Sequence, residues 1–248
     1  MKLLLDVGNT AVKWALAEAT RIDSNGYFVH RDRDFSALAT QAWSEIPTPD
    51  AVVVANVAGA DMAVEIKHFV TAAWQLVPEF VRVTEAACGV TNAYSTPGDL
   101  GVDRWVAMIA AHHAYDGAVC VIDCGTAITL DLLASSGQHR GGLILPGVDM
   151  LSQALQVNTA GIQLQDDSPT VMLLAQGTRN GVIGGAQYLV ASYIDRIVND
   201  MGDAAGEPVT SIITGGHAEQ LLPLMKVTVQ HAPELLLQGL AILSDGGA

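Results

Sequence analysis

The feature that most constrains the fold of this chain is a pattern that occurs twice. Near the N-terminus, the apolar run of residues 3–5 leads into Asp6 and Gly8, and an alternating apolar run follows. The same order returns 117 positions later at Asp123 and Gly125. Each copy predicts a β-hairpin that carries the aspartate at its tip. Because a repeat of this length fixes an architecture, the sequence indicates two similar lobes.

The tips of these hairpins are suited to bind phosphate. Successive N–H groups of a tight turn can point into one concavity and hold an anion, and a neighbouring carboxylate can hold the cation that accompanies it. In the second copy, Thr126 adds a hydroxyl group close to Asp123. From the residues alone, an ordinary turn whose polar side chains bond to their own backbone is equally compatible. The repetition favours two polar tips that face the phosphates of a ligand.

The pattern after the first hairpin predicts the rest of an N-terminal lobe. Residues 21–30 could add a third antiparallel strand. A helix over 35–46, a buried strand over 50–56, a helix over 61–73 and a short strand over 80–83 follow. Three antiparallel strands followed by helix, strand, helix and strand give the order of a ribonuclease-H-like lobe.

The chain after the second hairpin predicts the same scheme. Strands over 127–134 and 138–145 precede a long helical stretch over 170–201, which we expect to be broken near Gly177 and Gly181.

We therefore expect an α/β fold of two ribonuclease-H-like (actin-like ATPase) lobes, each with a mixed five-stranded sheet flanked by helices. The lobes are predicted to be residues 1–115 and 116–248, so a closing helix over 234–244 would belong to the second lobe.

Charge and composition narrow the classes of partner. The chain has 26 acidic and 12 basic residues and a formal net charge of −14, which argues against nucleic acid or an anionic membrane as a partner. Apolar residues make up 50% of the chain and charged residues 15%, which is enough apolar material for buried cores. No run of about 18 apolar residues occurs, so no membrane span is expected.

The cysteines indicate a reducing compartment. Cys88, Cys120 and Cys124 are an odd number without the spacing of a disulfide framework, so we expect a reduced, cytoplasmic protein. Cys120 and Cys124 point to one side of the same predicted strand, and we interpret them as core residues rather than metal ligands.

A carboxylate and a guanidinium stand side by side at the start of a predicted helix. Asp103 and Arg104 follow a stretch rich in Gly, Pro, Ser and Thr, and Asp99 could cap the helix that runs on to Tyr115. By itself, Asp103 could simply complement the helix dipole. The functional alternative is that the two side chains, about 100° apart on the helix, address different atoms of a substrate.

Two common phosphate-binding motifs and the dinucleotide fingerprint do not occur in the sequence. The chain contains no Gly-x-x-x-x-Gly-Lys-Ser/Thr and no kinase glycine-rich loop, and no Gly-x-Gly-x-x-Gly follows the first strand. A P-loop enzyme, a protein kinase and a Rossmann dehydrogenase are therefore not indicated.

Five motifs, in order and across nearly the whole chain, resemble the type III pantothenate kinases of the acetate and sugar kinase/Hsc70/actin superfamily. The matching stretches are residues 6–10, 101–104, 123–129, 141–147 and 214–216. The resemblance implies ATP-dependent phosphorylation of pantothenate to 4'-phosphopantothenate, the first step of coenzyme A biosynthesis. It also implies the two-lobed fold that the repeat predicts.

The resemblance implies how ATP and its metals would be held. The residues that would contact the ATP phosphates are Asp6, Val7, Gly8, Asn9, Thr10, Ala11, Val12 and Lys13. Asp6 would also face a Mg²⁺ ion. Thr126 would bind phosphate, and Asp123 would hold a monovalent cation, either K⁺ or NH₄⁺.

The resemblance implies a pantothenate site as well. Its lining would come from Tyr94, Gly101, Val102, Asp103 and Arg104, with Asp103 as the catalytic base that takes the proton of the hydroxyl group. Thr170 would reach the substrate, by implication from the partner subunit of a homodimer. Asn158 stands where some members of the family have histidine.

Two other functions remain open at this point. One is a different small-molecule kinase of the same superfamily, acting on acetate or a sugar. The other is a regulatory nucleotide-binding protein without turnover. The presence of Asp103, Asp123 and Thr126 favours an enzyme.

Overall fold

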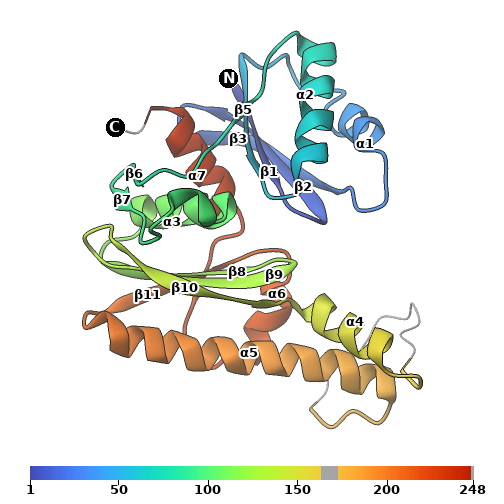
Figure 1. Cartoon of the computed structure of the whole chain (residues 1–248), viewed down its shortest axis with the longest axis vertical. Coiled ribbons are helices and arrows are strands. Elements are labelled where there is room, and N and C mark those ends of the chain that lie inside the picture. Colours follow the sequence, from blue (N-terminus) through green and yellow to red (C-terminus); the bar gives the residue numbers. More distant parts are fainter. Residues whose placement is uncertain (163–172, 247–248) are drawn as a thin grey trace. The chain divides into compact units, whose positions relative to one another are not determined.

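The computed structural model describes residues 1–162 and 173–246 (Figure 1). Thr170 therefore lies outside the described residues. The chain folds into two compact units. Unit 1 contains Met1–Asp116, Ser135–His139 and Glu234–Ala248, and unit 2 contains Gly117–Ala134 and Arg140–Pro233.

The sheet of unit 1 has the strand order β3-β2-β1-β4-β5. Its strands are β1 (Lys2–Val7), β2 (Ala11–Glu18), β3 (Arg21–Val29), β4 (Ala51–Asn56) and β5 (Glu79–Phe80). β1 pairs antiparallel with β2 and parallel with β4. The sheet is therefore mixed, as the predicted order of elements requires.

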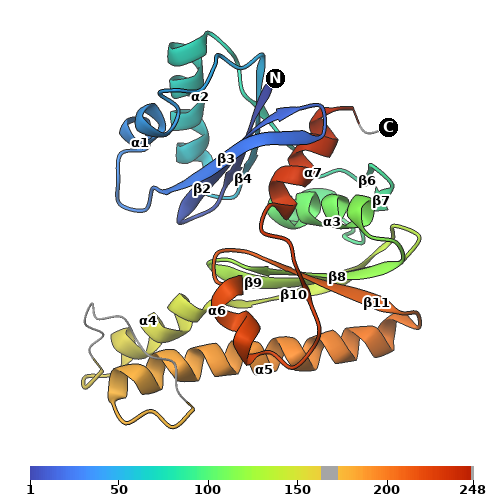
Figure 2. The same cartoon turned by 180° about the vertical axis from the view of Figure 1, so that it is seen from behind.

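Helices cover both faces of this sheet, which explains the continuous apolar run in β1. Two of them, α1 (Phe35–Ala42) and α2 (Ala60–Trp74), pack against alternate residues of β1, including Leu3 and Leu5 (Figures 1 and 2). Helix α7 (Leu235–Ser244) contacts β1, β2, β3 and β4 from the opposite face (Figure 2). A strand that is buried on both faces needs apolar side chains at every position rather than at every second one.

Helix α7 also packs closely on α3 (Val102–Ala114). Gly239 makes this approach possible, because a Cβ atom at that position would lie 2.2 Å from the carbonyl oxygen of Val106. The closing helix, which we expected to belong to the lobe 116–248, thus belongs to unit 1. Ser135–His139, within the expected second lobe, also belong to unit 1.

The segment that precedes α3 differs from the prediction. It contains two short strands, β6 (Ala86–Ala87) and β7 (Val90–Thr91), and a 3₁₀ turn, η1 (Pro97–Asp99). Asp99 ends that turn and does not cap α3, whose first flanking residue is Gly101, without a side-chain cap. The extended backbone at Leu100 separates the two helical segments, so the side chain of Asp99 is not at the capping position.

The sheet of unit 2 repeats the order of the first, as β10-β9-β8-β11-β12. Its strands are β8 (Ala118–Cys124), β9 (Ala127–Leu133), β10 (His139–Pro146), β11 (Val209–Thr214) and β12 (Gln230–His231). β8 is antiparallel to β9 and parallel to β11, as β1 is to β2 and β4. The predicted fold class, two lobes with mixed five-stranded sheets, is confirmed.

The helices of unit 2 are α4 (Val148–Asn158), α5 (Thr178–Ala205) and the short α6 (Ala218–Leu221), followed by a 3₁₀ turn, η2 (Leu222–Leu224). Gly177 precedes α5 as its N-cap residue. Gly181 does not break the helix, contrary to our expectation, because it lies in the first turn and the helix continues through it. The cost of one glycine in a helix, about 1 kcal/mol, is small beside the packing of 28 residues.

The core of unit 2 contains both cysteines of β8. Cys120 and Cys124 are fully buried among the apolar side chains of the sheet and of α5. Burial raises the pKa of each thiol to about 12, with a smaller contribution from the neighbouring Asp131 and Asp123, respectively. They are core residues, as predicted. Among the described residues, no helix is long and apolar enough to cross a membrane.

Candidate active site

The first predicted hairpin forms the tight turn between β1 and β2. The N–H of Gly8 donates to the carbonyl oxygen of Ala11 at 3.0 Å, which closes the turn. Asp6, one residue before the end of β1, is only 9% exposed, and Lys13 is its partner in the antiparallel ladder. Asn9 is exposed at the tip. A carboxylate thus stands where the strand pairing gives way to the turn.

The residues of this hairpin, 6–13, differ in the exposure of their side chains. The side chains of Val7 and Val12 are buried in the core, so only their backbone groups can reach a ligand. Thr10, Ala11 and Lys13 are partly exposed. This alternation follows from the two-residue period of a strand.

The sequence analysis missed a histidine that supports this turn. The Nε2 atom of His30 lies 2.8 Å from the carbonyl oxygen of Gly8. Because a carbonyl oxygen only accepts, Nε2 carries the proton and donates. The backbone N–H of His30 also donates to the carbonyl oxygen of Thr10 at 3.0 Å. The only signal in the sequence was the position of His30 at the end of the third predicted strand.

A second group of predicted residues comes together in unit 1 at the start of α3. The Nη1 atom of Arg104 donates to the hydroxyl oxygen of Tyr94 at 3.0 Å, and the guanidinium carbon lies 5.7 Å from the centre of the tyrosine ring. Arg104 is 5% exposed, whereas Tyr94 and Asp103 are partly exposed. A buried cation, a phenol and a carboxylate are therefore neighbours.

Gly101 leaves room for the carboxylate of Asp103. A Cβ atom on Gly101 would lie 2.5 Å from Oδ1 of Asp103, and the same oxygen accepts the backbone N–H of Arg104 at 2.8 Å. The glycine lets the carboxylate turn back over the first turn of the helix. Val102 begins α3 and is partly exposed.

The second predicted hairpin joins β8 and β9 in unit 2, and two glycine-containing turns enclose its tip. The N–H of Gly147 donates to the carbonyl oxygen of Thr126 at 3.0 Å, and a Cβ atom there would lie 2.3 Å from that oxygen. Gly215 has a φ of +95°, and a Cβ atom on it would lie 2.4 Å from Oδ1 of Asp123. Only glycine allows the backbone to approach the tip this closely.

The neighbouring strands align Asp123 and Thr126 with these turns. Asp123 pairs with Thr129 on β9 and with Thr214 on β11, so it lies where β8 and β11 both end. The N–H of His217 donates to the carbonyl oxygen of Cys124 at 2.9 Å. In an α/β sheet, the carboxyl ends of parallel strands are the usual place for ligands.

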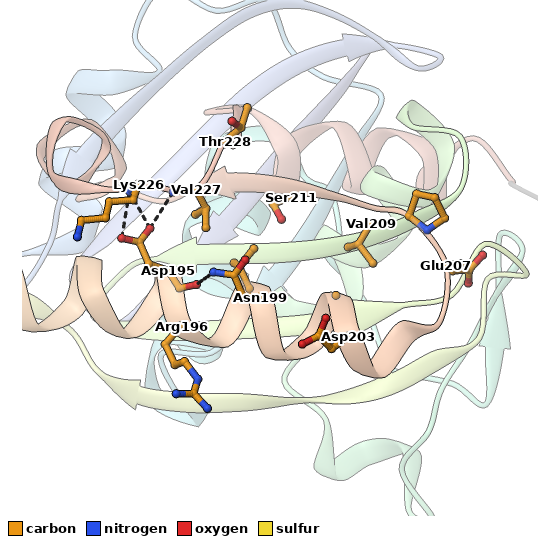
Figure 3. A pocket seen from close by; sticks show the side chains of 13 residues that line it. Asp195, Arg196, Asn199, Asp203, Glu207, Val209, Ser211, Lys226, Val227 and Thr228 are labelled. Carbon is orange, nitrogen blue, oxygen red and sulfur yellow. Dashed lines mark hydrogen bonds between the residues drawn. The ribbon is translucent and has the colours of Figure 1, made fainter.

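A polar pocket in unit 2 lies elsewhere. Its lining comes from the C-terminal half of α5, the start of β11 and residues 226–228, and the predicted site residues are not among those that line it (Figure 3). The carboxylate of Asp195 accepts the backbone N–H groups of Lys226 and Val227 at 2.9–3.0 Å. This pocket is therefore at the end of β11 opposite to Thr214.

The carboxylates that we predicted as metal ligands belong to separate groups. Within residues 1–162 and 173–246, no three His, Cys, Asp or Glu side chains cluster as a complete metal site. A Mg²⁺ ion that is bound with ATP needs only one or two protein carboxylates, because phosphate oxygens and water complete its coordination. Asp6, a buried carboxylate one residue before the end of β1, fits that requirement. The amide of Asn158 donates to the carbonyl oxygen of Ala154 within α4.

One ion pair in unit 2 links two of the turns around the second tip. Nε2 of His217 lies 3.2 Å from Oδ2 of Asp149, which is in the first turn of α4 just after Gly147. The hydrogen bond to Asp149 is the largest cause of a raised pKa of His217, and it outweighs the opposing effect of burial. The imidazolium form of His217 thus holds the β11–α6 turn to the start of α4.

This pair predicts a pH-dependent contribution to the free energy of unfolding. Since the pKa of His217 is raised in the folded protein, the stabilisation is complete below the unfolded-state pKa of about 6.5 and is lost as the pH rises through the folded-state pKa. His217→Asn should therefore destabilise the protein more at pH 6 than at pH 8.5, by up to about 1 kcal/mol for a partly exposed pair. Urea titrations at the two pH values measure the difference.

The matched control is His231→Asn, at an exposed histidine on β12 of the same unit. It should not reproduce the pH-dependent difference. An equal effect of His217→Asn at both pH values would contradict the role of the charged pair.

Comparison with known proteins agrees with this arrangement. A family profile described as type III pantothenate kinase matches residues 2–200. A type III pantothenate kinase from Nitrosococcus oceani is 38% identical over 246 residues, which cover 97% of this chain and 92% of that protein.

Two solved structures share the fold at lower identity. A conserved putative Baf family transcriptional activator from Campylobacter jejuni is 19% identical with a TM-score of 0.58, over 99% of this chain and 100% of that one. A putative 2-dehydro-3-deoxygalactonokinase from Sinorhizobium meliloti is 12% identical with a TM-score of 0.56, over 98% and 99%. At such identities the two structures bear on the fold alone. The family profile and the full-length relative decide the family: this chain belongs to the type III pantothenate kinases.

Proposed function

We propose that this chain transfers the γ-phosphoryl group of ATP to the hydroxyl group of pantothenate and so forms 4'-phosphopantothenate in the first step of coenzyme A biosynthesis. The observation that carries this proposal is the group at the start of α3, where the carboxylate of Asp103 lies next to the buried Arg104 and its hydrogen-bond partner Tyr94. Pantothenate offers a hydroxyl group to Asp103 and a carboxylate to Arg104. Membership of the family supports the same substrates.

Phosphoryl transfer depends more on the positioning of the reactants and the stabilisation of phosphate charge than on a strong base. Phosphoryl transfer passes through a loose transition state, in which the attacking hydroxyl group loses its proton late. A carboxylate such as Asp103 can accept that proton although it is a weak base. The planar guanidinium of Arg104 suits a carboxylate of the substrate, because its N–H groups form a fork.

Each hairpin tip has groups that can bind phosphate. Backbone N–H groups of the β1–β2 turn and the hydroxyl group of Thr126 on the β8–β9 turn are suitable donors. Asp6 would hold Mg²⁺, which supplies charge neutralisation at the phosphate oxygens when it is bound. His30 keeps the first turn in shape by its hydrogen bond to Gly8.

The role of Asp103 can be tested by a substitution that keeps its size. Asp103→Asn removes the proton acceptor, so kcat should fall by roughly 10²–10⁴-fold, the usual contribution of general base catalysis. Steady-state kinetics with pantothenate measure kcat, and ATP binding should be unchanged.

Asp99→Asn is the matched control, since Asp99 is an exposed carboxylate in the turn just before α3. It should retain the kcat of the wild type. An Asp103→Asn enzyme with near wild-type kcat would refute the assignment.

We also propose that Asp123 holds a monovalent cation, K⁺ or NH₄⁺. Its carboxylate lies at the end of β8, among backbone groups of the tip and of the Gly215 turn. Such groups offer oxygens to a cation, which would help neutralise ATP. The chain itself has few cations to do this, with a net charge of −14.

Exchange of the salt tests this cation. Replacing KCl by NaCl at equal concentration should lower kcat by roughly 10²-fold, the cost of losing one strong electrostatic contact to the transition state. Asp123→Ala should lose most activity and also the difference between the salts. The control Asp203→Ala, at an exposed carboxylate on α5, should keep both. Equal kcat in the two salts would rule the cation out.

We further propose a cytoplasmic homodimer in which unit 2 forms the interface. Large apolar side chains are exposed on three neighbouring elements of this unit, β10, α4 and α5. They are Leu143, Ile144, Met150, Leu155, Val157 and Leu189. Exposed large apolar side chains in this number on one unit favour a protein partner. The role of Thr170, which would complete the pantothenate pocket of the partner subunit, stays a prediction.

Mixing of inactive chains tests the shared pocket. When Asp103→Asn and Thr170→Val chains exchange subunits at equal amounts, about one quarter of all pockets should regain both wild-type residues, because half of the dimers are mixed. Pantothenate kinase activity of the mixture measures this recovery.

Two further variants decide whether the interface is the proposed one. Adding Val157→Asp to both chains should abolish the recovery, because a charge would be buried at the interface. Adding Val77→Asp to both should not, since Val77 is a comparably exposed apolar residue of unit 1. No recovery despite demonstrated subunit exchange would place the whole pocket within one chain.

A further inference from the structure

The turn between β9 and β10 is built into unit 1, although both strands belong to the sheet of unit 2. The N–H of Thr91 donates to the carbonyl oxygen of Gly137 at 2.9 Å, and Thr91 forms a parallel bridge with Gln138. Gly137 has a φ of +81°, and a Cβ atom there would lie 1.9 Å from the carbonyl oxygen of Gly89. The turn is therefore fixed against the end of β7.

This turn ends at His139, which is 1% exposed. Its ring is stacked on the ring of Tyr94, with 6.0 Å between the ring centres and 13° between the planes. The N–H of Ala93 donates to Nδ1 of His139 at 3.5 Å. One imidazole thus contacts both the side chain of Tyr94 and the backbone immediately before it.

Burial alone does not account for a histidine at this position. An imidazole loses hydration when it is buried, and an apolar side chain of similar size would fill the space without that cost. Because Nδ1 accepts an N–H, its lone pair is directed to Ala93, and Nε2 is the ring nitrogen that carries a proton. The contacts of His139 fix both the position and the tilt of the tyrosine ring.

Tyr94 in turn restricts the orientation of Arg104. Its hydroxyl group accepts the hydrogen bond from Nη1, and its ring lies under the guanidinium. A flexible arginine side chain needs such fixed partners to present its planar group in one orientation, and pre-organisation of this kind reduces the cost of binding. The order of contacts is His139 to Tyr94 to Arg104.

We propose that His139 is a positioning residue, which sets the orientation of Tyr94 and Arg104 for the carboxylate-bearing substrate without touching that substrate. This inference rests on the proposed function, because it assigns the Tyr94–Arg104 pair to the substrate. It adds a residue that none of the sequence motifs contains. It also gives the β9–β10 turn a role in substrate binding.

A double-mutant cycle on the full-length protein tests this role. His139→Ala should raise KM for pantothenate about tenfold and leave KM for ATP within about twofold, a coupling in the range found for residues in contact. In a Tyr94→Ala background, His139→Ala should add little further change, because the residue through which it acts is gone. His139→Phe, which keeps a stacked ring, should recover most of the lost affinity for pantothenate.

The matched control is His112→Ala. His112 is near the same turn, since Cβ atoms on Gly89 and Gly137 would each lie 3.1 Å from its Nε2. This variant would reveal an effect that comes from a general loosening of the turn. We expect both of its KM values to stay at the wild-type level. If His139→Ala does not fold, His139→Asn, which keeps an acceptor for the N–H of Ala93, replaces it with the same expected result.

The outcomes separate the two proposals. If the wild-type chain does not phosphorylate pantothenate, the proposed function fails. If the wild type is active but the effects of His139→Ala and Tyr94→Ala multiply independently, or both KM values rise together, the positioning role is wrong.

Discussion

The antiparallel pairing within each hairpin is the interaction on which the rest of the structure depends. β1 with β2 and β8 with β9 form ladders that end close to Asp6 and Asp123, and each is continued on its other side by a parallel strand. An antiparallel pair needs only a short turn, so the carboxylate and the turn backbone are fixed at one edge of the sheet. The parallel neighbours, β4 and β11, then bring the loops that follow them to that edge. Asp6 and Asp123 thus take their positions from backbone hydrogen bonds in two buried sheets.

Close backbone packing determines what surrounds the second tip. Gly147 and Gly215 approach Thr126 and Asp123 so closely that a side chain on either would overlap the tip. The backbone groups that gather there are small, rigid dipoles, and they need no reorganisation when a charged ligand arrives. The Asp149–His217 pair joins the two turns through side chains. This side-chain connection depends on pH, whereas the backbone packing does not.

The balance of charge explains why the buried arginine matters. A chain with a net charge of −14 repels anionic substrates at long range, and this repulsion is weakened by salt. Arg104 is shielded from water, so in the proposed site its charge would act on a substrate at short range and with a larger effect. Tyr94 contacts this cation through a hydrogen bond, and His139 is stacked on the tyrosine ring. The apolar, doubly covered sheet supplies the rigidity that such a group needs.

The sequence by itself determined the elements and the residue types of the candidate site, because both are encoded locally. The apolar runs of β1 and β8, the Asp-x-Gly tips and a helix with Asp103 and Arg104 near its start depend on neighbours a few positions away. Only the tertiary structure decided which distant segments meet. The place of α7 in unit 1 depends on the fit of Gly239 against Val106, and the stacking of His139 on Tyr94 joins residues 45 positions apart. The continuity of α5 through Gly181 likewise reflects packing along the whole helix, whereas the propensity of one glycine is a weak local term. Contacts of this kind leave no periodic trace in the chain, since each depends on the shape of a partner that folding alone brings close.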